Sequence, residues 1–207
     1  MRSLIAAAML SLGGLAMTAS GVVADDDALY AKLKALLPPG PDAALCYART
    51  YDAEHLTQHP KQKVTEVVFS LRYVPLSEEE ATIIFNDDGS QGKQDFRYDF
   101  TMSANVKGRA ETLYASGNCT SAATIGCGVE CDGGGVDLEP LAGNEGSILM
   151  RLERELSDRI RMTPGCGEEE DAVEIEAGAD DKLFKLDKAP AALCQTMQQT
   201  LDKALGQ

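Results

Sequence analysis

The sequence predicts a mainly β fold, an antiparallel meander of about eight strands forming an up-and-down barrel or a curved sheet, with N- and C-terminal helices and stabilising disulfides. Several short segments alternate apolar and polar residues and are separated by Gly, Pro, Asn and Asp turn signals. Seven of the eleven aromatic residues lie between Phe69 and Tyr114, which places the main apolar core on the first strands. Six cysteines and a central Cys- and Gly-rich stretch, Gly117 to Leu141, indicate a cross-linked centre.

Residues 1–24 have the pattern of a secretory signal peptide. Arg2 gives a positive start, Leu4 to Met17 is apolar and uncharged, and the small residues before Asp25 suit cleavage after Ala24. A membrane anchor is the alternative, but a spanning helix needs about 20 apolar residues and this run is shorter. We therefore expect residues 25–207 to form a single β-rich domain, periplasmic or secreted, with no transmembrane segment after signal cleavage.

Two terminal helices are expected to frame the strands. The first is predicted over Asp25–Leu37, because its leucines and Tyr30 recur at helical spacing and Pro38 follows. The segment from Ala43 to Leu56 is then expected to form a second short helix or an irregular stretch. The last helix is predicted over Pro190–Leu205, with Cys194 beside an apolar stripe of Leu193, Met197, Leu201 and Leu205.

The clearest strand is Asp95 to Val106, because every second residue from Phe96 onward is apolar and the residues between are polar. Its apolar face would line a cavity or belong to a filled core. One segment is ambiguous: Leu149, Leu152, Leu156 and Ile160 make a helical stripe, but the preceding hairpin signal favours a strand. The other predicted strands are Val64–Val74, Ala81–Phe85, Glu111–Ala115, Ile125–Cys131, Gly135–Leu141, Ile148–Leu152, Arg159–Met162 and Ala172–Glu176.

The even number of cysteines in an exported chain predicts up to three disulfides. We favour a bond between Cys46 and Cys194 that ties the two ends of the chain. We also favour a local bond from Cys119 to either Cys127 or Cys131, and a bond from Cys166 to whichever cysteine is left. These pairings rest on position alone, since six cysteines allow fifteen connectivities.

The chain carries 33 acidic and 19 basic residues, a net charge of −14 at pH 7. Signal cleavage would remove Arg2 and no acid, which makes the net charge −15. Phosphate backbones and anionic lipid headgroups repel such a chain, so no nucleic-acid partner is expected. A cationic protein, a basic peptide or a metal ion fits the charge, although acidity also serves solubility alone.

Two short patterns carry a resemblance. One is His-Leu-x-x-His-Pro-x-Gln-x-Val, from His55 to Val64, and the other is Cys-Asp-Gly-Gly-Gly, from Cys131 to Gly135. Together they resemble an uncharacterised family of small exported proteins from alphaproteobacteria. The resemblance covers about a fifth of the chain and implies a Gram-negative periplasmic or secreted setting. It brings no activity with it.

His55 and His59, the two histidines of the chain, are spaced so that a helix would place both imidazoles on one face. Adjacent Glu54 would supply a third metal ligand. Pro60 ends any helix there, and no Glu follows His55 directly as a metalloprotease motif requires. The alternative is that both histidines pack the corner between the helix and the next strand.

Three other segments invite a chemical interpretation. Asp132, Gly133, Gly134 and Gly135 would expose backbone N–H groups to an anion, or form a tight turn with positive φ. Cys127 and Cys131 are spaced too widely for a thiol redox motif, which favours structural disulfides. The acidic loops Asn86–Gly89 and Glu168–Asp171 lack the ligand spacing of a calcium loop, which favours solvated turns.

No catalytic motif emerges from the sequence, so no catalytic residue and no cofactor are assigned. The function that fits composition and fold class is an exported, non-enzymatic binding or interaction protein. Its ligand would be a cationic protein or peptide, or a small apolar molecule. The alternatives are a metal-dependent hydrolase that uses His55 and His59, and a structural protein of the cell envelope.

Overall fold

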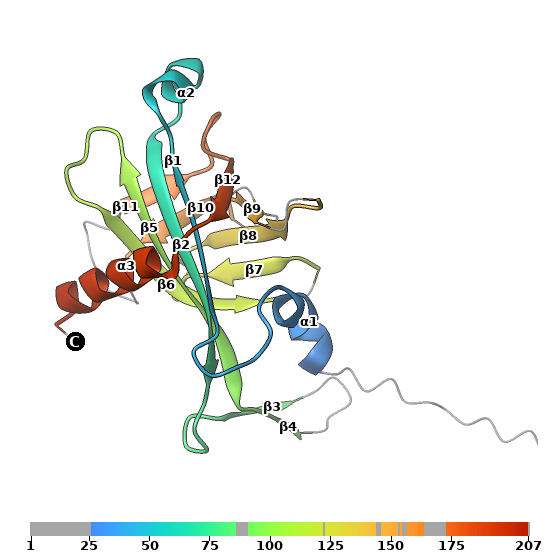
Figure 1. Ribbon diagram of the computed structural model, residues 1–207. Helices are drawn as coiled ribbons and strands as arrows, with labels where there is room; N and C mark the ends of the chain where they lie inside the picture. Colours follow the sequence, from blue (N-terminus) through green and yellow to red (C-terminus); the bar gives the residue numbers. More distant parts are fainter. Residues whose placement is uncertain are drawn as a thin grey trace, which may run out of the picture.

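The computed structural model describes residues 26–85, 91–121, 123–143, 146–152, 154, 157–163 and 173–206. Eight strands close into an antiparallel barrel in the order β1, β12, β9, β8, β7, β6, β5, β2 (Figure 1). The last strand, β12, pairs with the first, β1. The structure thus confirms the predicted meander and shows that it closes. The predicted signal peptide, residues 1–24, lies outside the described residues.

Two short strand pairs and three helices lie outside the barrel sheet in the described part of the chain. Strands β3 and β4 form one ribbon and β10 and β11 another, both outside the barrel sheet. Within the described part of the chain, no helix combines the length and apolarity needed to cross a membrane. The barrel strands are β1 Ala44–Thr50, β2 Val64–Pro75, β5 Phe96–Val106, β6 Leu113–Thr120, β7 Ile125–Gly128, β8 Gly135–Pro140, β9 Ser147–Arg151 and β12 Leu183–Lys188. The other elements are α1 Asp26–Leu36, α2 Ala53–Gln58, β3 Thr82–Phe85, β4 Gln91–Gln94, β10 Arg159–Met162, β11 Val173–Glu176 and α3 Ala191–Ala204.

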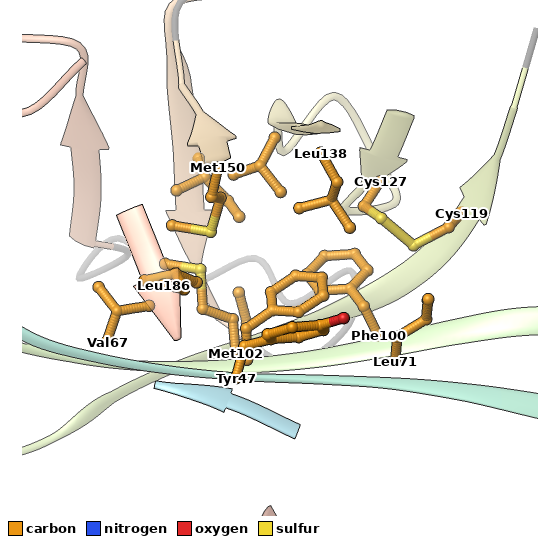
Figure 2. Packing of buried hydrophobic residues seen from close by; sticks show 14 of the residues in the cluster. Tyr47, Val67, Leu71, Phe100, Met102, Cys119, Cys127, Leu138, Met150 and Leu186 are labelled. Atoms are coloured by element: carbon orange, nitrogen blue, oxygen red, sulfur yellow. A yellow bond between two sulfur atoms is a disulfide. The ribbon is translucent and has the colours of Figure 1, made fainter. Parts of the chain in front are cut away.

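The two long paired strands β2 and β5 contribute many of the side chains of the core. Alternate residues of each strand point inward, as the sequence pattern predicts, and Phe69 and Phe100 stack with ring centroids 5.7 Å apart. Figure 2 shows Phe100 and Met102 facing Leu138 and Met150 from the opposite wall. Each such buried side chain contributes about 1.5–3 kcal/mol relative to exposure. The apolar face of β5 therefore belongs to a filled core.

Segments outside the barrel sheet cover both ends of the barrel. At one end Leu33 of α1 and Leu37, which directly follows α1, pack into the core, and the Tyr98 hydroxyl donates a hydrogen bond to the Leu37 carbonyl at 2.9 Å. At the other end Ile160 of β10 and Ile175 of β11 join the same buried cluster. The N-terminal helix is thus an end cap of the barrel, which explains why its apolar stripe is needed.

The prediction of a helix or irregular stretch over Ala43–Leu56 is wrong for its first half. Residues Ala44–Thr50 are barrel strand β1, and only Ala53–Gln58 is helical. Tyr47 faces the barrel interior, while Cys46 packs on the outside against α3. Because both faces of β1 are covered, its sequence lacks the apolar–polar alternation that reveals a half-buried strand.

Two further differences concern strands β12 and β3. Strand β12 was not predicted, although Phe184 and Leu186 alternate with exposed residues and both are buried. The predicted strand Ala81–Phe85 exists as β3, but it pairs only with β4 outside the barrel, and Ile83 is 62% exposed. The strand assignment of the ambiguous segment near Leu149 is confirmed as β9.

Helix α3 lies across the outer face of the barrel, against β1 and β2 (Figure 1). Its buried residues are Cys194, Met197 and Leu201, whereas Leu193 and Leu205 are largely exposed. The predicted stripe is therefore shifted by about one residue toward Cys194. The shift follows from the bond between Cys194 and Cys46 of β1, with Cα atoms 5.8 Å apart, which sets the face that α3 presents.

The structure contains both favoured disulfides. Besides Cys46–Cys194, Cys119 of β6 is bonded to Cys127 of β7, directly opposite in the sheet and inside the barrel (Figure 2). Cys131 is disulfide-bonded as well. The structural interpretation of Cys127 and Cys131 is thus confirmed. The prediction for Cys166 lies outside the described residues.

Candidate functional site

A cleft of about 780 Å³ opens beside the end of the barrel that α1 covers. Three segments that are distant in the sequence enclose it: α1, the loop from β6 to β7, and the hairpin from β8 to β9. We call it the barrel-mouth cleft. Its volume lies within the range of about 300–1,000 Å³ that is typical of small-molecule pockets.

The floor of the barrel-mouth cleft is apolar and continuous with the core. Tyr47, Leu138 and Ile148 line it and are also members of the buried cluster, while half-buried Leu36 contributes from α1. Burial raises the pKa of the Tyr47 phenol, so this hydroxyl stays neutral at physiological pH. The floor therefore offers an uncharged surface to a ligand.

Charged side chains surround this floor. The Lys32 ammonium donates a hydrogen bond to the Ala123 carbonyl, which joins α1 to the β6–β7 loop. The Asp137 carboxylate lies 2.8 Å from the Nε atom of Arg154. Exposed Glu139 and Arg151 complete the rim. Charges of both signs thus lie at the edge of the cleft rather than on its floor.

Glycine makes room for the Arg154 guanidinium on the outer face of β7 and β8. A Cβ atom on Gly126 would lie 3.0 Å from one guanidinium nitrogen, and one on Gly135 would lie 2.7 Å from the other. A Cβ on Gly135 would also lie 2.1 Å from the Cys127 carbonyl oxygen. The Gly135 position therefore requires glycine because of close approach, independently of any ligand role.

At the edge of the cleft, the Ser147 hydroxyl donates a hydrogen bond to Asp187 Oδ1 at 2.6 Å. This bond, more than the nearby Lys185 and Arg49 charges, lowers the pKa of Asp187. We expect Ser147→Ala to raise that pKa toward the ordinary value of an aspartate. A lowered folded-state pKa gives stability that is present above the unfolded pKa and is lost as pH falls through the folded one, so the variant should lose this contribution.

A titration of the Asp187 carboxyl carbon followed by NMR measures the effect. Ser116→Ala, which removes a hydroxyl on another part of the barrel, should leave the pKa of Asp187 unchanged. An Asp187 pKa that is the same in wild type and Ser147→Ala would contradict the assignment of the hydrogen bond as the main cause.

The two histidines lie in a corner between α2 and β2. Asp52 caps α2 by accepting a hydrogen bond from the His55 backbone N–H at 2.8 Å. The His55 ring stacks on His59 with centroids 4.3 Å apart and contacts Tyr51 at 4.7 Å. The His55 Nε2 atom lies 3.0 Å from Gln62 Oε1, and Gln62 is buried.

This corner accounts for the His-Leu-x-x-His-Pro-x-Gln-x-Val pattern as local structure. The Gln62 amide also donates to the Val64 carbonyl at 2.8 Å, which fixes the entry into β2. Predicted ligand Glu54 is exposed and belongs to the same short helix. Among the described residues, no group of three or more His, Cys, Asp or Glu side chains is placed to hold a metal ion. The ring contacts and hydrogen bonds of His55 and Gln62 thus support the alternative that both histidines pack the corner between α2 and β2.

Asp181, which sequence reasoning missed, holds this corner from the other end of the chain. Its carboxylate accepts hydrogen bonds from the backbone N–H groups of Lys63 at 2.7 Å and Val64 at 3.2 Å. Asp181 is only 1% exposed. Neighbouring Asp180 accepts a third bond, from Lys61 N at 3.0 Å. The sequence signal was an adjacent acid pair just before β12, which by itself resembles any solvated turn.

Asp132 and Gly133 belong to the tight turn Glu130–Gly133 between β7 and β8, Gly134 follows the turn, and Gly135 is the first residue of β8. Cys131 and Asp132 have positive φ angles of 57° and 60°, as two-residue hairpin turns require. The Gly133 N–H donates to the Glu130 carbonyl, and the Gly133 carbonyl accepts from Arg161 N at 2.7 Å. The turn therefore docks β10 against the barrel. The acidic loops Asn86–Gly89 and Glu168–Asp171 lie outside the described residues.

Comparison of the chain with protein-family models, with curated proteins and with solved structures found no match. Function is therefore inferred from the geometry of the barrel-mouth cleft and of the surfaces around it.

Proposed function

We propose that the protein is an exported, non-enzymatic binding protein that holds a small, mainly apolar molecule in the barrel-mouth cleft. The observation that carries the proposal is the cleft itself, about 780 Å³ in volume, with the core side chains Tyr47, Leu138 and Ile148 as its floor. Burying an apolar ligand there gains about 25 cal/mol for each Å² of apolar surface removed from water.

Disulfide bonds support an oxidising compartment, the periplasm or the cell exterior, as the place of action. The net charge of −14 disfavours anionic polymers and lipid surfaces as partners. A neutral ligand avoids this repulsion. A cationic protein or peptide also fits the charge, and native mass spectrometry separates the two possibilities.

We expect Ala35→Trp to block the barrel-mouth cleft. Ala35 is exposed on α1 and lines the cleft, so the indole would occupy ligand volume without entering the core. Binding of the neutral fluorescent probe phenylnaphthylamine should weaken by about tenfold or more, equivalent to about 1.4 kcal/mol. Ala31→Trp on the same helix is the matched control, because Ala31 is exposed and does not line the cleft.

Native mass spectrometry of protein purified from the periplasm tests the ligand directly. An added mass of a few hundred daltons that Ala35→Trp abolishes would support the proposal. A bare protein, together with probe binding that is equal in wild type and Ala35→Trp, would refute it. A retained basic polypeptide would instead favour the protein-partner alternative.

A further inference from the structure

Two rows of polar residues cross the outer face of the barrel beneath α3. In the first row Arg72 of β2, Asp99 of β5 and Asn118 of β6 lie opposite one another. In the second row Ser70, Thr101 and Ser116 lie opposite one another in the same way. A groove of about 410 Å³ runs over these rows and under the C-terminal half of α3. None of its lining residues belongs to the barrel-mouth cleft.

Arg72 is the unusual member of this groove. Its Nε atom is buried without a hydrogen-bond partner, and among the described residues its guanidinium makes no ion pair. Arg97 beside it is different, because its Nε atom bonds both oxygens of Asp99, at 2.8 and 3.1 Å. The Asp99 carboxylate is thus already engaged. No described side chain therefore neutralises the Arg72 guanidinium, which lines the groove, and a bound anion would supply the missing partner.

The remaining walls are arranged around Arg72. Thr101 Oγ1 donates to Gln198 Oε1 at 2.9 Å, and Gln198 Nε2 donates to Asp202 Oδ1 at 2.7 Å. These bonds hold α3 over the groove. The side chains of Ser116 and Asn118 line it as well and make no hydrogen bond with another described residue, so both have donors to offer.

We propose that this groove binds a small organic monocarboxylate, with the Arg72 guanidinium as the anchor of the carboxylate. The planar fork of an arginine matches the two oxygens of a carboxylate. Ser116 and Asn118 donate further hydrogen bonds. Asp202 and Glu130 line the same groove, and the whole chain is acidic, so a multiply charged anion such as phosphate is repelled more strongly than a single carboxylate.

The test follows binding of propionate to the full chain by NMR, through the backbone amide signals and by saturation transfer to the ligand. Propionate should shift the signals of Arg72, Ser116 and Asn118 most, and the neutral isostere propionamide should not. Arg72→Met should weaken propionate binding by about tenfold or more, as expected for loss of a charge-assisted pair. Arg72→Lys keeps the positive charge but lacks the planar guanidinium. Its affinity for propionate should lie between those of wild type and Arg72→Met.

Two matched variants test whether propionate binding depends on this groove in particular. Arg109→Met makes the same charge change at an exposed arginine that pairs with Glu111 away from the groove, and should bind propionate like wild type. Ala35→Trp, which blocks only the barrel-mouth cleft, should also leave propionate binding intact. Unchanged affinity in a folded Arg72→Met protein, or tighter binding of inorganic phosphate than of propionate, would overturn the proposal.

Discussion

Replacing Asp181 with alanine is expected to lower the free energy of unfolding by about 2–4 kcal/mol. The buried carboxylate is the acceptor for the N–H groups of Lys63 and Val64 at the start of β2. Alanine would leave both donors without a partner, and each unsatisfied buried donor costs about 1–3 kcal/mol. Urea unfolding followed by circular dichroism measures the change.

Asp180→Ala is the matched control for this effect. Among the described residues Asp180 accepts one hydrogen bond, from the backbone N–H of exposed Lys61, so its loss should cost less than about 1 kcal/mol. Asp181→Asn keeps one acceptor oxygen, so its free energy of unfolding should lie between those of wild type and Asp181→Ala. Equal stability of Asp181→Ala and Asp180→Ala would show that the corner does not depend on the buried carboxylate.

The second large effect is expected for the double variant Cys46→Ala/Cys194→Ala. This disulfide spans 148 residues, and loss of such a cross-link typically costs about 2–5 kcal/mol. Besides this bond, α3 is held by a small cluster with Met197 and Val68 and by the hydrogen bond from Thr101 to Gln198, so the disulfide is a large part of its attachment. Hydrogen exchange should show α3 losing protection while β2 and β5 keep theirs.

The variant Cys119→Ala/Cys127→Ala provides the comparison. That bond closes a loop of only 8 residues, so its chain-entropy contribution is smaller, about 2–3 kcal/mol. It also lies between two adjacent barrel strands, so exchange should rise in β6 and β7 instead of α3. If α3 lost its protection from hydrogen exchange in both double variants, or in neither, the Cys46–Cys194 bond would not be the specific attachment of α3 to the barrel.

The sequence predicted best those strands that have one face in the core and one partly open to water. Strand β5 is the clearest example, and the pattern of Phe96 to Val106 placed its buried face correctly. Strand β1 could not be recognised, because Tyr47 meets the core on one side and Cys46 meets α3 on the other. The outer face of β1 is buried only because α3, from the far end of the chain, packs on it.

The candidate sites were harder to predict for the same reason. The barrel-mouth cleft exists only where α1, the β6–β7 loop and the β8–β9 hairpin meet, and none of these segments carries a chemical motif. Arg72 has the spacing of a solvent-facing residue of β2, and only the folded chain places α3 beside it to form the groove that it lines. The histidine pair, by contrast, was conspicuous in sequence and has local packing contacts.

The pairing of β1 with β12 has a consequence for the order of events during folding. Tyr47 cannot meet Lys188 until nearly the whole chain is available, so the contact that closes the sheet is among the most distant in sequence. Folds dominated by such contacts form slowly, because loop closure must precede the stabilising contacts. Until β12 arrives, β1 and β9 are open edges that can pair with other chains. A chain that is synthesised from its N-terminus therefore remains prone to aggregation until β12 is available to pair with β1 and β9.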